Sequence, residues 1–234
     1  MGKAISICLI LAGLLISSAI TWAAPPKDYK IVYNYKNPDG TLFRIIKYYM
    51  RDGLKFRSEY YSPTSYDINA EAKASTDLNK EGNSGGDLKV NMKSKQEDLK
   101  NLQPHTVEIL RNDKGLVWLL DPSYKIYSEA SLSKDSWERT FTKIFIDDFT
   151  GFKKKGEAKL LNLNCDIYEN TGKVQEDTWT NIAYVAKDLN VILKTEMLKN
   201  GKLVETMEAS EFSTDKPEPS LFELPKGYSK NVNN

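Results

Sequence analysis

The chain has 234 residues, with 33 Lys and Arg residues against 32 Asp and Glu residues, one His and two Cys. This length suits one sizeable domain or two small ones, and the near-neutral charge excludes the strong basic field that is typical of nucleic-acid-binding proteins. One His and two Cys leave too few ligands for zinc, haem or iron–sulfur sites, so we expect no metal and no other cofactor.

Residues 1–23 have the features of a secretory signal peptide. Lys3 supplies a positive start, residues 5–16 form an apolar run, and Thr21 and Ala23 place small residues before a cleavage site after Ala23. We expect cleavage there.

The alternative is an uncleaved membrane anchor over residues 4–20, a span at the lower limit for crossing a bilayer. Cleavage would leave Cys165 as the only cysteine, so the exported chain would have no intrachain disulfide. The short basic start and compact apolar run are typical of bacterial export, and we expect a location in the periplasm or cell envelope.

Turn sequences divide the next region into strands of an antiparallel meander. Residues 29–36 alternate between apolar and polar side chains, a turn at 37–40 leads to a strand at 42–50, and a loop at 51–53 leads to a strand at 54–61.

The loop lengths predict the register of these strands. A four-residue first loop pairs Tyr35 with Leu42, and a three-residue second loop pairs Tyr48 with Phe56. We prefer the three-residue second loop because a shift of one residue would turn the apolar positions to the other face.

Aromatic residues are concentrated in this meander. The predicted register places Arg44 between Tyr33 and Tyr60, where a guanidinium could stack on aromatic rings, and the strand at 42–50 is apolar on both faces. Two interpretations stay open, an aromatic sheet core and a lined ligand cavity. For the cavity, the candidate ligand-binding residues are Tyr33, Arg44, Ile46, Tyr48, Phe56 and Tyr60.

Residues 62–104 break the strand pattern. They contain one aromatic residue, Tyr66, and many charged and glycine residues, a composition that buries too little apolar surface to offset the cost of ordering. We expect a polar, flexible insertion, and its second half (87–102) could form a weak helix. A mobile lid over a binding face is the alternative.

Strand signals resume at 106–111, 116–120 and 124–127. Ser133 is a favourable N-cap for a helix that we expect from Lys134 to Phe149. An apolar stripe at helical spacing should place this helix on the sheet through its large side chains, which are Trp137, Phe141, Ile144 and Phe145.

Four more strands are expected, at 157–168, 178–186, 190–198 and 203–212, the last two joined by a hairpin turn. Cys165 lies at an in-facing position and should be buried. The fold class is therefore mainly β with helix (α+β), a curved antiparallel sheet or incomplete β-barrel of about ten or eleven strands wrapped on one main helix.

The residues give little support to catalysis. His105 is the only imidazole and follows a proline at a loop end, and neighbouring carboxylates at Asp147 and Asp148 would point about 100° apart on a helix. We therefore expect a protein that is not an enzyme.

Three segments resemble the lipoprotein-carrier (LolA/LolB-like) half-barrel superfamily, GEAKLLNLNCDIYE (156–169), WTNIAYVAKDLNVILK (179–194) and PEPSLFELPKGY (217–228). The matching positions are Gly156, Tyr168, Trp179, Asp188, Phe222, Pro225, Gly227 and Tyr228. The resemblance implies an eleven-stranded, incompletely closed barrel with helices on its concave side and an apolar cavity for acyl chains or a partner segment.

Our expectation is one exported half-barrel domain at 24–228 with a tail at 229–234. It would bind an acyl chain, lipid or lipoprotein in its concave side, as in outer-membrane lipoprotein sorting or sensing, with transient contact to the outer or inner membrane surface. The alternative is a protein-interaction or structural domain of a cell-envelope complex with no small ligand.

Overall fold

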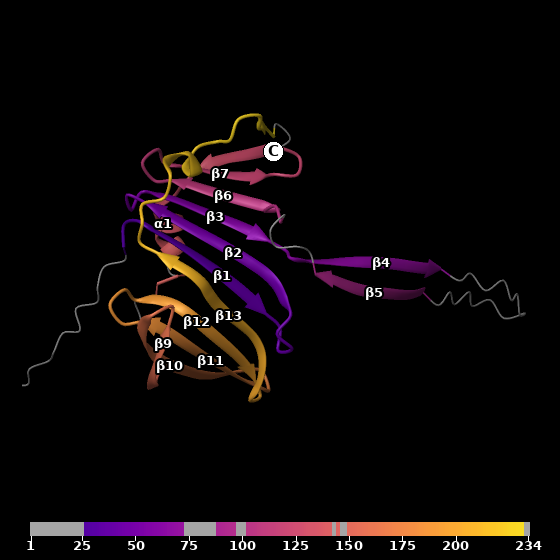
Figure 1. Ribbon diagram of the computed structural model, residues 1–234, viewed down its shortest axis with the longest axis vertical. Coiled ribbons are helices and arrows are strands. Elements are labelled where there is room, and N and C mark those ends of the chain that lie inside the picture. The colour runs from indigo at the N-terminus through magenta and orange to yellow at the C-terminus, as the bar shows by residue number, and fades with distance from the viewer. Residues whose placement is uncertain (1–25, 73–87, 97–101, 142–143, 146–148, 232–234) are drawn as a thin grey trace, which may run out of the picture.

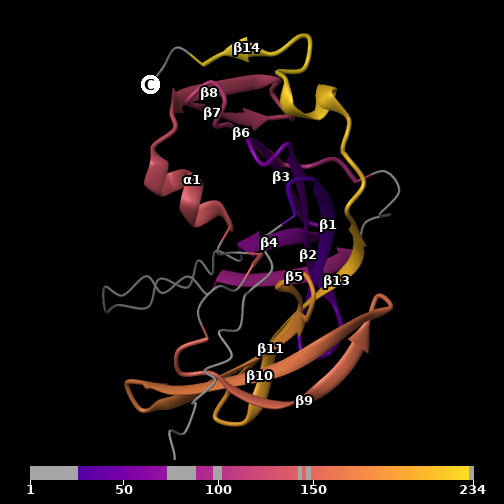
Figure 2. The same ribbon diagram turned by 90° about the vertical axis from the view of Figure 1, so that its left-hand side faces the viewer.

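The computed structural model describes residues 26–72, 88–96, 102–141, 144–145 and 149–231. Within these ranges, twelve strands form one curved and mostly antiparallel sheet, and one α-helix lies on its hollow side (Figures 1 and 2). The mainly β fold with one main helix is confirmed. The predicted signal peptide at 1–23 lies outside the described residues.

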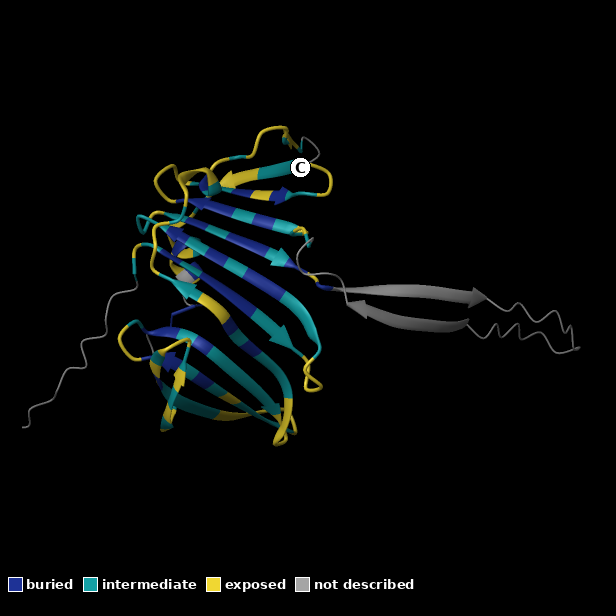
Figure 3. Cartoon of the chain, in the orientation of Figure 1, coloured by how far each residue is buried: buried dark blue, intermediate teal, exposed yellow. Residues whose placement is uncertain are grey.

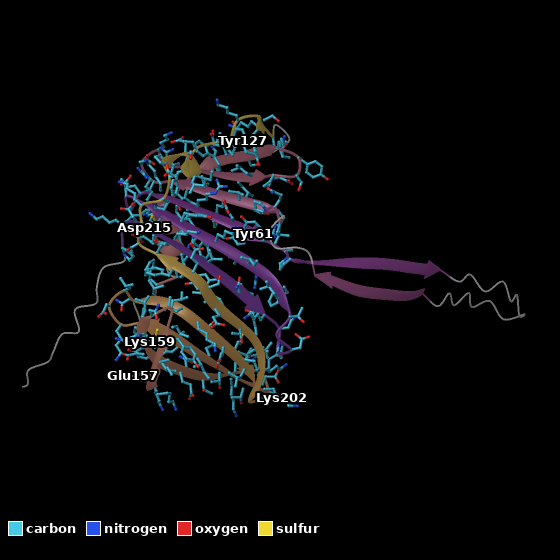
Figure 4. All side chains as sticks on the ribbon, viewed as in Figure 1. Tyr61, Tyr127, Glu157, Lys159, Lys202 and Asp215 are labelled. Atoms are coloured by element: carbon cyan, nitrogen blue, oxygen red, sulfur yellow. The ribbon has the colours of Figure 1, made fainter. Side chains whose placement is uncertain are left out.

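The large sheet has the order β14-β8-β7-β6-β3-β2-β1-β13-β12-β11-β10-β9, and β4 pairs only with β5 in a separate two-stranded sheet. Tyr127 on β8, next to the edge strand β14, and Lys159 on the other edge strand, β9, lie toward opposite ends of the large sheet (Figure 4). The strands are β1 (Tyr29–Lys36), β2 (Leu42–Arg51), β3 (Lys55–Tyr61), β4 (Thr64–Ala72), β5 (Leu88–Gln96), β6 (Thr106–Arg111), β7 (Leu116–Asp121), β8 (Ile126–Ser131), β9 (Lys153–Leu160), β10 (Leu163–Val174), β11 (Asp177–Ala186), β12 (Val191–Lys199), β13 (Lys202–Ser213) and β14 (Ser229–Lys230).

Most predicted strands are confirmed to within one residue at each end, but three regions differ. The first is β8, which runs from Ile126 to Ser131 instead of over 124–127. The segment expected to be a polar insertion contains β4 and β5, and the weak helix predicted at 87–102 is wrong because Leu88–Gln96 is a strand. Its apolar residues at 88, 90 and 92 have the two-residue period of a strand.

The predicted strand at 157–168 is two strands joined by a tight turn. Leu161 and Asn162 both have positive φ angles, 49° and 63°, and reverse the chain between β9 and β10. Such turns favour Asn or Gly at both central positions, so Leu161 concealed the signal. Cys165 on β10 is buried, as expected, and burial raises the pKa of its thiol.

The helix α1 (Lys134–Phe141) is shorter than predicted. Ser133 caps it by accepting a hydrogen bond from the Ser136 N–H at 3.1 Å, which confirms the predicted N-cap. Beyond the helix, Phe145 forms a β-bridge with Val191. The last members of the apolar stripe are therefore buried by pairing with the sheet instead of by a continued helix.

The predicted register is wrong by two residues at both hairpins of the meander. Tyr35 pairs with Arg44 instead of Leu42, next to a β-bulge, and Tyr48 pairs with Ser58 instead of Phe56. The second loop occupies 52–54, not 51–53. Because both shifts are even, the side chains keep their predicted faces, except next to the bulge, where Lys36 pairs with Leu42.

The central strands contain many buried residues (Figure 3), and these residues form clusters on both faces of the sheet. On the concave face, a large cluster joins β1 and β2 to Trp137, Ile144 and Phe145. On the convex face, Phe222 of the short 3-10 helix η1 (Pro219–Phe222) is fully buried over β6 and β7. Tyr49 of β2 packs against this convex cluster, and Ile45 of β2 is buried with Val32 and Tyr61, which explains why β2 is apolar on both sides.

Three arginines hold the C-terminal segment on the convex face. The guanidinium of Arg51 donates to the carbonyl of Pro217, that of Arg57 to Leu221 at 2.9 Å, and that of Arg111 to Phe222 at 3.0 Å. The arginines come from β2, β3 and β6, which are adjacent in the sheet. We call residues 217–224 the C-terminal strap.

Candidate functional site

A cavity of about 330 Å³ lies between α1 and the concave face of the sheet. Figure 2 shows α1 on the hollow side of the sheet. The sheet side of the lining consists of Tyr48, Phe56, Tyr60, Glu108, Leu110 and Val117. The other side consists of Ser131, Leu132, Ser136, Arg139 and Thr140.

Aromatic rings that contact one another form the wall of the cavity on the sheet side. The rings of Tyr48 and Phe56 stack with their centroids 5.6 Å apart, and the ring of Tyr33 meets Tyr48 edge-on at 6.0 Å. Burial raises the pKa of the Tyr48 phenol well above its usual value, so this group stays neutral. This wall therefore presents uncharged, mainly apolar surface to a ligand.

The helix side of the lining is more polar. The N-cap at Ser133 fixes the start of α1 and thereby the position of Ser136, and the Thr140 hydroxyl donates to the Ser136 carbonyl at 3.0 Å. Arg139 contributes an exposed guanidinium-bearing side chain to the lining. A ligand in the cavity would thus meet apolar rings on one side and hydroxyl groups on the other.

Three of the six predicted ligand-binding residues, Tyr48, Phe56 and Tyr60, line this cavity. Tyr33 and Ile46 lie in the buried concave cluster, and the Tyr33 hydroxyl donates to the Ile192 carbonyl at 2.6 Å. Ligand binding by any of these residues stays a prediction.

Arg44 lies apart from this cavity. Its guanidinium sits 4.2 Å from the Tyr35 ring centroid and 3.8 Å from the Glu205 carboxylate. The predicted position between Tyr33 and Tyr60 is wrong because the register shift gives that place to Ile46. The expected stacking on an aromatic ring does occur, but on a different tyrosine.

Glu108 is a lining residue that the sequence reasoning missed. It lies at the centre of β6, opposite Ser58, whose hydroxyl donates to its carboxylate at 3.4 Å. The alternation of Thr106, Glu108 and Leu110 could have indicated that all three share the face of the apolar cluster. A lone carboxylate in a predicted strand carries no other signal of a binding role.

A smaller cavity of about 240 Å³ near the start of β6 includes His105, Asp121 and Ser128 in its lining. The Nδ1 atom of His105 lies 3.0 Å from the Thr106 hydroxyl, and one oxygen of Asp121 accepts backbone N–H groups of the following turn. The hydrogen bonds found among described residues do not join these three side chains into a nucleophile–base relay.

Across the described part of the chain, no three His, Cys, Asp or Glu side chains are grouped so that they could hold a metal ion. The same residues include no helix long and apolar enough to cross a bilayer.

No protein-family model matches the chain, and no curated protein matches its sequence. Solved structures match its fold at low identity. An uncharacterized conserved protein from Thermus thermophilus is 12% identical, with a TM-score of 0.46 over 88% of this chain and 90% of that one.

The MucA/MucB complex of Pseudomonas aeruginosa gives 10% identity and a TM-score of 0.41, over 84% of this chain but only 55% of that one. A domain from Vibrio parahaemolyticus, provisionally described as an outer membrane lipoprotein-sorting protein domain, gives 11% identity and a TM-score of 0.31 over 86% and 91% of the two chains. At these identities and TM-scores, the likeness concerns the fold alone.

Proposed function

We propose that the protein binds an amphiphilic ligand, the acyl chain of a lipid or lipoprotein, in the cavity between α1 and the concave face of the sheet. The observation that carries this proposal is the cavity itself, with a stacked aromatic wall and a few polar groups opposite. Ligand sites are typically concave, mostly apolar and furnished with a small number of polar groups that fix orientation.

The size of the cavity limits what fits without movement. A volume of about 330 Å³ lies at the lower end of the usual range for ligand pockets, about 300–1,000 Å³. A short acyl chain or part of a longer one would fit, whereas a larger ligand would need α1 to move outward. Among the described side chains of α1, Trp137 and Thr140 are buried, so such a movement would have to expose them.

The proposal is a binding function without a chemical step, in an exported protein. Export rests on the signal-peptide features of residues 1–23, and it places the protein in the periplasm or cell envelope. There it would bind the acyl chain of a lipoprotein, or of a lipid that it meets through transient contact with the outer or inner membrane surface.

A protein-interaction role in an envelope complex is the alternative function. The aromatic residues of the meander offer little surface to a partner because they are mostly buried, as Tyr29, Tyr33 and Tyr61 illustrate. The observation that favours a partner is instead the two-stranded sheet of β4 and β5, which projects from the large sheet (Figure 1).

Native mass spectrometry of gently purified protein tests the first proposal. We expect a population of the mature exported chain that carries a lipid-sized mass, and we expect Val117→Trp to lose this mass because an indole at this position would take up space in the cavity. Leu119→Trp is the matched control, since Leu119 lies two residues along β7, is 51% exposed and does not line the cavity. Wild-type protein without bound lipid, even after incubation with a lipid extract, would contradict the proposal.

A further inference from the structure

We propose that Glu108 determines the specificity of the cavity and selects amphiphiles that carry an ammonium group over amphiphiles with an anionic head group. This inference rests on the proposed function, because it assumes that the cavity between α1 and the sheet takes an amphiphile. It adds the chemical class of the head group and names the residue that recognises it.

The position of Glu108 is the first argument. The carboxylate projects from the middle of β6 on the concave face, with Leu110 on the same strand and Val117 on the next strand in the same lining. A charged side chain among such neighbours loses hydration, and the loss is costly unless an opposite charge or hydrogen-bond donors replace the water.

The partners of Glu108 are the second argument. Among the described residues, it forms no ion pair, and its hydrogen bond comes from the Ser58 hydroxyl at 3.4 Å, which is long for an O–H···O bond. Ser58 itself is fully buried. Glu59, the neighbour of Glu108 on the adjacent strand, is by contrast paired with Arg57 at 2.7 Å. Glu108 therefore retains acceptor capacity that faces the cavity.

The aromatic rings in the same lining are the third argument. Tyr48, Phe56 and Tyr60 share the lining with Glu108, and the electron-rich faces of aromatic rings attract ammonium groups. A lining with a carboxylate and three aromatic rings favours a cation through two interactions, the attraction of opposite charges and the attraction of the ring faces for ammonium. The same arrangement repels an anionic head group.

The lining also contains one cation, Arg139. Its side chain is exposed on α1, whereas Glu108 belongs to the sheet side of the cavity. Selection by Arg139 would give the opposite preference, for anionic amphiphiles, and this makes the two residues separable by experiment.

Binding of dodecyltrimethylammonium and of dodecanoate should be compared by isothermal titration calorimetry below their micellar concentrations, at one ionic strength. We expect the wild-type protein to bind the ammonium amphiphile about tenfold more tightly, because opposite charges attract and like charges repel at a partly desolvated site. Glu108→Gln should abolish this preference while dodecanoate still binds. Glu208→Gln removes the same charge at a partly exposed position paired with Lys36 and should keep the preference.

Equal binding of both amphiphiles by the wild-type protein would overturn this inference and leave the proposed function intact. A preference for dodecanoate that disappears in Arg139→Gln would also overturn it. Failure of both amphiphiles to bind would instead count against the proposed function. Circular dichroism of each variant confirms that the sheet is retained.

Discussion

Replacement of Phe222 by Ala tests whether the C-terminal strap closes the convex face. Phe222 is fully buried among side chains of β6 and β7, including Ile109 and Trp118. Truncation of a buried Phe to Ala costs about 3–5 kcal/mol, because the transfer free energy is lost and a cavity remains. If the strap also detaches, the carbonyl hydrogen bonds from Arg57 and Arg111 are lost as well, so about 3 kcal/mol is the smaller expected effect.

Urea unfolding followed by tryptophan fluorescence measures this loss, since Trp118 lies in the same cluster. In a thermal scan the change corresponds to a Tm lower by roughly 6–20 °C, at about 2–4 °C per kcal/mol for a domain of this size. Tyr124→Ala is the control, because Tyr124 is 78% exposed and its loss should change stability by less than about 0.5 kcal/mol. A Phe222→Ala variant as stable as the wild type would refute the packing of the strap.

Three further predictions concern the helix, the projecting ribbon and acid stability. Trp137→Ala should cost about 3–5 kcal/mol in urea unfolding, because Trp137 is 8% exposed in the concave cluster; near-wild-type stability would show that α1 does not pack on the sheet. Replacement of residues 66–100 by a short Gly-Ser linker should change stability by less than roughly 1 kcal/mol, since β4 and β5 pair only with each other; a loss of several kcal/mol would contradict this. The hydrogen bond from Arg111 lowers the pKa of Asp113 below its ordinary 3.8. The ionised Asp113 therefore stabilises the folded state fully above its unfolded-state pKa, and this contribution is lost as the pH falls through the lower folded-state pKa. In Asp113→Asn, the free energy of unfolding should therefore fall less steeply below about pH 4 than in the wild type. An unchanged pH dependence in this range would argue against the ion pair.

The sequence predicts the strands of the large sheet well because each has a two-residue apolar period and flanking turn residues. The strand at 106–111 and the turn at Asn200 and Gly201, which both have positive φ, are examples. The turn at Leu161 and Asn162 was not predicted because Leu is an unusual residue for a left-handed conformation. The end of α1 was not predicted because the apolar residues Ile144 and Phe145 fit a helical stripe as well as they fit a segment that pairs with the sheet.

The candidate site was harder to predict than the fold. Tyr48, Phe56 and Tyr60 were found because face alternation survives an even register error. Arg44 was misplaced because a β-bulge and a turn longer than expected moved its cross-strand neighbours by two positions. Glu108 was missed because strand alternation places it on a face but cannot show that α1 covers that face and encloses a cavity.

A fluorescence titration tests the central claim, that the cavity between α1 and the sheet binds an acyl chain. The probe is an environment-sensitive fluorescent acyl chain with an uncharged head group, so that the result does not depend on Glu108. We expect saturable binding to the wild-type protein and to Leu119→Trp, and a loss of at least about tenfold in affinity for Val117→Trp, since the indole takes the space of the chain. Equal affinity for wild type and Val117→Trp, or no binding to the wild type, would contradict the claim.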